Sequence, residues 1–178
     1  MRKLNGIIAG VVLVLFVVHG ILGALNLMNI APVIIKALSR AMLSLIGVHA
    51  LISIGLSVKA VVTAAKTRAP YFRQNRLFWA RRLSGALIMV LVFFHITAFG
   101  YTSGGVFRLV PFDVFRLITQ LLFLFGVAVH IITNVKPMLI TFGVRKLRPK
   151  AGDILFFVSA AMLFMTVGFI IYYIRWQL

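Results

Sequence analysis

The sequence predicts an all-α integral membrane protein, a bundle of five transmembrane helices with its N-terminus in the cytoplasm and its C-terminus outside. Three observations support this prediction. Hydrophobic residues make up 62% of the 178 residues and charged residues 12%, with a mean hydropathy of +1.10, whereas soluble domains are about a quarter charged. Apolar stretches recur at the length that crosses a bilayer core. Basic residues gather in alternate connections, which indicates the orientation.

A single membrane domain is expected over residues 1–178. The five predicted helices cover approximately residues 5–28, 41–65, 83–102, 114–142 and 154–174. Backbone groups in lipid must bond internally, and runs this continuous do not resemble the alternating strands of a barrel, so they are expected to be helices. Residues 31–40 form a short segment expected at the interface. No connection is long enough to hold a catalytic core outside the membrane.

The distribution of charge predicts the topology. Basic residues precede the first helix and fill the connections after the second and the fourth: Arg2, Lys3, Lys66, Arg68, Arg73, Arg76, Arg81, Arg82, Arg145, Lys146, Arg148 and Lys150. The positive-inside rule places these connections in the cytoplasm, and a bacterial cytoplasmic membrane is the expected location. The net charge of +17 therefore indicates topology and predicts no nucleic-acid partner.

The lack of Cys and the scarcity of acidic residues exclude several chemistries. The chain has no Cys and no Glu, and its acidic residues are Asp113 and Asp153. Thiolate metal sites and the paired carboxylates of glycosidases are therefore excluded.

The four histidines are His19, His49, His95 and His130, one in each of the first four predicted helices. Ionisable residues inside a membrane are rare and usually functional. A single one could be a helix–helix hydrogen bond, but four distributed in this way predict a shared role. Depth along the helices, at about 1.5 Å per residue, pairs His19 with His95 on the outer side and His49 with His130 towards the cytoplasm.

Two histidines from facing helices can ligate haem iron, and haem is a common cofactor in helix bundles. Zinc and copper fit less well because the pairs lack carboxylate or thiolate ligands. Gly126 lies four residues before His130 and could make room for a flat ligand, although close helix packing would also explain it. Arg82 and Ser84 are candidate donors to porphyrin propionates at the cytoplasmic side.

The stretch Arg82-Leu83-Ser84-Gly85, followed by an apolar run to His95, resembles the di-haem cytochrome b membrane anchors of succinate:quinone oxidoreductases, including quinol:fumarate reductases. The layout of five helices with a His on four of them is similar to that family's single-subunit type, in which the first and third His bind one haem and the second and fourth the other. Two features depart from the family. The motif here stands on the third helix instead of the first, and the intramembrane Glu of its fumarate reductases is absent.

The resemblance implies a membrane anchor with two haem b groups. Such an anchor passes electrons between a cytoplasmic flavoprotein and iron–sulfur succinate dehydrogenase or fumarate reductase and a membrane quinone, menaquinone or ubiquinone. Dicarboxylate chemistry would occur on the partner subunits, and dimerisation of the complex stays open. Asp113, Tyr101 and Arg116 are the quinone-site candidates, although Asp113 also fits an N-cap of the helix at 114–142.

Two alternatives stay open. The chain could be the cytochrome b subunit of another respiratory dehydrogenase or a hydrogenase. It could also be a haem-free transporter that uses its intramembrane His for protons or metal.

Overall fold

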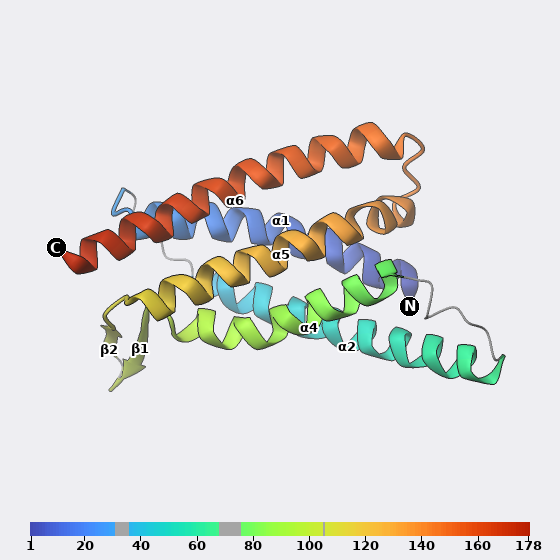
Figure 1. Cartoon of the computed structure of the whole chain (residues 1–178), viewed down its shortest axis with the longest axis horizontal. Coiled ribbons are helices and arrows are strands. Elements are labelled where there is room, and N and C mark those ends of the chain that lie inside the picture. Colours follow the sequence, from blue (N-terminus) through green and yellow to red (C-terminus); the bar gives the residue numbers. More distant parts are fainter. Residues whose placement is uncertain (31–35, 68–75, 105) are drawn as a thin grey trace.

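The computed structural model describes residues 1–30, 36–67, 76–104 and 106–178, and helices make up most of them. They are α1 (Arg2–Leu27), α2 (Lys36–Lys66), α4 (Arg76–Thr97), α5 (Val114–Thr141) and α6 (Leu147–Gln177). All five lie along the long axis of the molecule (Figure 1). Each is long and apolar enough to cross a membrane. The prediction of five apolar helices is confirmed for the described part of the chain.

Three predicted helix starts are wrong. Helix α4 begins at Arg76 instead of residue 83, α6 at Leu147 instead of residue 154, and α2 already includes Lys36 instead of starting at residue 41. The added turns are rich in Arg, Lys, Leu and Ala, which favour helix wherever they stand. An apolar run marks only the part of a helix that lipid would cover, so it underestimates helices that continue beyond it. Residues 31–35 of the expected interface segment lie outside the described residues.

The end of the third predicted helix is also wrong. Helix α4 stops at Thr97, and strand β1 (Gly100–Ser103) pairs in antiparallel fashion with β2 (Val106–Leu109). Gly104 at the turn has φ of 56°, a left-handed conformation that suits glycine. A glycine at a hairpin turn is favoured for this reason, and the turn outweighs the apolar residues around it. A small hairpin therefore connects α4 to α5.

Helices α1 and α5 end in the same way. After α5, Gly143 has φ of 72°, its N–H donates to the Ile140 carbonyl, and the Val144 N–H donates to the Leu139 carbonyl. After α1, Asn29 takes the equivalent position with φ of 60°. These are Schellman motifs, in which a left-handed residue lets the chain satisfy the last carbonyls of a helix.

A buried apolar cluster joins α1, α5 and α6. Val17, Leu124 and Met165 belong to a buried cluster contributed by these three helices. Gly20 of α1 lies so close to Met165 that a Cβ atom would collide with its side chain. Small residues at such a point let two helices approach closely, as they do in membrane bundles.

The outer surface of the bundle is apolar. Leu51 of α2 is 72% exposed and Phe156 of α6 is 79% exposed. Contiguous apolar surface of this extent is rare on soluble monomers, so it fits contact with lipid. Figure 1 shows the N-terminus and the connection from α5 to α6 at one end of the bundle, and the C-terminus and the β-hairpin at the other. We call these the N-terminal end and the hairpin end.

Candidate functional site

The four histidines form two facing pairs, as their depths predicted. The rings of His19 on α1 and His95 on α4 have centroids 6.1 Å apart, at an interplanar angle of 75°. The rings of His49 on α2 and His130 on α5 have centroids 6.4 Å apart, at 90°. Each pair joins two helices that are not neighbours in sequence. We call them the hairpin-end pair and the N-terminal-end pair.

The two pairs lie at different levels of the bundle. Gln120 contacts His95, and it precedes His130 by ten residues on the same helix. At 1.5 Å per residue, this separation places the pairs about 15 Å apart along the axis of α5. The structure therefore places the two histidine pairs at two separate levels of the bundle.

In the hairpin-end pair, His95 is held more firmly than His19. The Nδ1 atom of His95 is 2.7 Å from Oε1 of Gln120, and its ring stacks on Phe123 with centroids 5.0 Å apart. His19 Nδ1 is 3.3 Å from Oγ of Ser39 on α2. Both rings thus use Nδ1 for a neighbouring polar side chain, which leaves Nε2 as the nitrogen available to a ligand.

In the N-terminal-end pair, His130 Nδ1 is 3.1 Å from Oγ of Ser84, and that hydroxyl donates to the Arg81 carbonyl. A Cβ on Gly85 would lie 3.4 Å from Cε1 of His130, so α4 approaches this ring closely. The Nδ1 atom of His49 is buried without a hydrogen-bond partner among the described residues, although the Asn5 backbone lies close enough to act on the ring.

The ring separations fit one metal atom between each pair. Histidine binds metals at about 2.0 Å, and with about 1.1 Å from nitrogen to ring centre, two opposed imidazoles have centroids about 6.2 Å apart. The observed 6.1 Å and 6.4 Å lie on either side of that value. No group of three or more His, Cys, Asp or Glu side chains is found together in the described residues. Each pair can therefore offer two histidine ligands, without a third His, Cys, Asp or Glu beside them among the described residues.

Each histidine pair joins two helices that make few direct contacts with each other. The extensive contacts are those of α4 with α5, α1 with α6, α5 with α6, and α1 with α2. The helices that share a histidine pair, α1 with α4 and α2 with α5, are not among them. All four histidines are half-buried. A flat group inserted between the rings would therefore separate helices that pack weakly without it.

A proline in α5 fixes α4 beside the N-terminal-end pair. Pro137 lies inside α5 and has no N–H, so the carbonyl four residues earlier, at Thr133, loses its helical partner. Nε of Arg81 donates to that carbonyl at 2.9 Å. An unpaired carbonyl in lipid would cost several kcal/mol, and Arg81 removes that cost while joining α4 to α5.

The predicted propionate donors have protein partners. Nε of Arg82 donates to Oγ of Ser57 on α2 at 3.2 Å, and its guanidinium lies 3.7 Å above the Phe78 ring. Ser84 bonds to His130, so its hydroxyl orients a histidine. Gly126 lies against Leu87 and Ile88, which is the close helix packing considered as the alternative. The glycine that faces His130 is Gly85.

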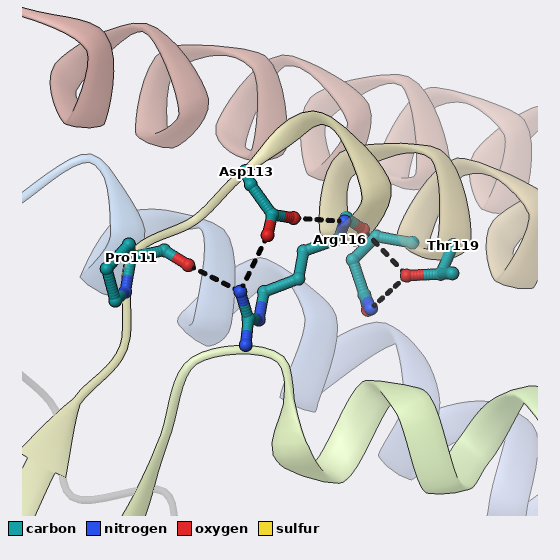
Figure 2. Close-up of polar contacts among 5 residues, drawn as sticks. Pro111, Asp113, Arg116 and Thr119 are labelled. Carbon is teal, nitrogen blue, oxygen red and sulfur yellow. Dashed lines mark hydrogen bonds and ion pairs between the residues drawn. The ribbon is translucent and has the colours of Figure 1, made fainter.

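The quinone candidates separate into two places at the hairpin end. Asp113 accepts the Arg116 backbone N–H at 2.8 Å, which confirms its N-cap role, and it pairs with the Arg116 guanidinium at 3.0 Å (Figure 2). Both residues line a shallow cavity of about 190 Å³ with Phe94 and Thr119. Tyr101 lies opposite Arg108 in the hairpin and does not line that cavity.

Sequence reasoning missed Ser39 and Gln120, which bond to His19 and His95. Gln120 was detectable as an amide inside the apolar run at 114–135, since a polar side chain placed in lipid needs a partner. Ser39 lay in the segment expected outside the second helix and gave no such signal.

No family model, curated protein or solved structure matches this chain.

Proposed function

We propose that this chain is a di-haem b membrane anchor that passes electrons between a cytoplasmic dehydrogenase and a quinone. The observation that carries the proposal is the pair of facing histidine sites with ring separations suited to one metal each. With two protein ligands per site, a planar macrocycle that supplies the remaining four ligands is the group that fits. Haem is the common cofactor of this kind in helix bundles.

The residues of each site would bind and orient the group. His19 and His95 would ligate one iron, and His49 and His130 the other. Ser39, Gln120 and Ser84 accept or share a hydrogen at Nδ1 of three of the rings, and such partners fix the tautomer and orientation of a ligating histidine. Haem, when bound, supplies a one-electron carrier at each level. Arg82, whose Nε bonds to Ser57 on α2, would be a candidate to meet an acidic edge of the group at the N-terminal end.

The orientation follows from the basic residues at the N-terminal end. This end would face the cytoplasm of a bacterium and the hairpin end would face outside, by the positive-inside rule. Arg76 is exposed there and would contribute to docking a flavoprotein and an iron–sulfur subunit. Arg68 and Arg73 of the same connection lie outside the described residues. Quinone would react near the hairpin-end pair, at the end of the bundle where Asp113, Arg116 and Phe94 line a cavity.

The decisive experiment is optical. The chain is expressed with haem available, purified in detergent, and its reduced-minus-oxidised spectrum and haem content are measured. We expect b-type bands and two haems per polypeptide. A folded, colourless preparation would contradict the proposal and favour a transporter that uses its histidines without haem.

The partner is tested by affinity purification from native membranes under mild detergent. We expect a flavin-containing dicarboxylate enzyme and an iron–sulfur protein in the eluate. Recovery of a hydrogenase or formate dehydrogenase instead would keep the haems but assign the chain to another respiratory complex.

A further inference from the structure

A completely buried side-chain amide distinguishes the hairpin-end pair from the N-terminal-end pair. Gln120 is 0% exposed, in the first third of α5, inside a helix suited to lipid. Ordering and burying a glutamine costs free energy unless both ends of its amide are bonded. Both ends are bonded here: Oε1 is 2.7 Å from Nδ1 of His95, and Nε2 donates to Oγ1 of Thr119 at 3.4 Å.

The bonds around Thr119 determine which way the amide points. Oγ1 of Thr119 donates its hydrogen to the Arg116 carbonyl at 2.8 Å, as Figure 2 shows. Because the Thr119 hydroxyl has a single hydrogen and donates it to Arg116, it can only accept a hydrogen bond from Gln120. The NH₂ group of the amide must therefore face Thr119, and its carbonyl oxygen must face His95.

An amide oxygen cannot donate, so His95 must carry its proton on Nδ1. Nε2 is then unprotonated, and its lone pair is available on the edge of the ring away from Gln120. Phe123 stacks on the same ring at 20°, which limits its rotation. The ring is thus held in one tautomer and one orientation by two contacts.

We infer that Gln120 is a positioning residue that makes His95 a more basic ligand and thereby lowers the reduction potential of the hairpin-end haem. This inference rests on the proposed function. An acceptor at Nδ1–H increases electron density on the ligating nitrogen, and a more strongly donating axial ligand stabilises the oxidised iron. Among the described residues no side-chain amide is found at the other pair, where the Ser84 hydroxyl and the Arg81 backbone lie at His130 and only the Asn5 backbone acts on His49.

The test replaces Gln120 and titrates both haems. In Gln120→Leu we expect two haems to remain bound and the potential of one to rise, while the other is unchanged. The haem that shifts is identified as the one absent from His95→Ala. Gln120→Glu keeps an oxygen acceptor at this position, so its potential should stay at or below that of the wild type. Thr119→Val removes the group that orients the amide and should produce a smaller rise in the same haem.

The matched control is Ser84→Ala, which removes the hydroxyl beside His130 and should affect only the other haem. Two bound haems with unchanged potentials in Gln120→Leu would overturn the inference and leave the proposed function intact. Equal shifts in both haems would also overturn it, because a general loosening of the bundle would explain them. If Gln120→Leu fails to insert into the membrane, Gln120→Glu and Thr119→Val are compared instead. A reduction potential that rises in Thr119→Val but not in Gln120→Glu supports the inference, and equal potentials in the two variants refute it. A wild-type chain that binds no haem would end both proposals.

Discussion

The two histidine pairs have similar ring separations but different supports. At the hairpin end, a buried amide and a stacked phenyl ring hold His95. At the N-terminal end, His130 bonds to a serine beside the arginines of α4, and one nitrogen of His49 stays unpartnered among the described residues. Similar ligand geometry in different surroundings is how a protein gives two identical cofactors different properties. The two histidine pairs therefore differ mainly in the residues that surround their rings.

The largest expected effect comes from removing one ligand of each pair. If the proposed function is right, His95→Ala should abolish the hairpin-end haem and largely spare the other, and His130→Ala should do the reverse, because the two pairs are about 15 Å apart along α5. Haem content and reduced-minus-oxidised spectra measure both. Loss of all haem from either variant, with normal membrane insertion, would show that the two sites are not independent.

A second prediction concerns the bond between Arg81 and the Thr133 carbonyl. Arg81→Ala should lower the free energy of unfolding by about 1.5–3 kcal/mol, since it removes a charged hydrogen bond from a carbonyl that Pro137 leaves open. Thermal unfolding in detergent, followed by circular dichroism, measures the loss.

The control is Pro137→Ala, which restores a helical N–H to Thr133. In that background Arg81→Ala should cost less, because the carbonyl already has a partner. Equal costs in both backgrounds would contradict the role given to the proline.

A third prediction concerns a smaller loss of stability at the hairpin end. Asp113→Ala removes the N-cap of α5 and should cost about 1 kcal/mol. Asp113→Asn retains the cap and loses only an exposed ion pair, so it should be close to wild type. The same unfolding assay ranks the three proteins. An Asn variant as unstable as the Ala variant would make the ion pair, and not the cap, the main contribution.

The smallest expected effect is on docking. Arg76→Gln should weaken binding of the proposed soluble subunits less than tenfold at low salt, since exposed charges interact weakly and are screened. Arg108→Gln, an exposed arginine at the hairpin end, is the matched control and should leave binding unchanged. Binding measured over a salt gradient distinguishes the two ends, and an equal effect of both variants would contradict the proposed orientation of the partners.

The features that the sequence predicted are those set by composition and length. Apolar runs of about 20 residues located all five helices, and the depth of each histidine predicted its partner, because a helix rises by a constant distance per residue. Helix ends were less predictable. The start of α4 at Arg76 and its end at Thr97 depend on helix propensity and on a glycine turn, which hydropathy does not report.

The surroundings of the histidines could not be predicted, because they depend on how the helices are rotated about their axes. Ser84 was predicted to donate to a porphyrin propionate at the interface, but the rotation of α4 about its axis turns its hydroxyl towards His130. Gly126 shares a face with His130 yet packs against Leu87. Gln120 needed a structure to find its partner, since an amide inside a helix can meet any of several neighbours.

The order of the chain has a consequence for how the protein is assembled. Helices α1 and α2 form one helical hairpin and contribute His19 and His49, while α4 and α5 form another and contribute His95 and His130. Each site therefore takes half of its ligands from each hairpin, and neither site exists until the two hairpins meet. In the proposed function, each haem would cross-link the two halves, so haem binding would stabilise the assembled bundle.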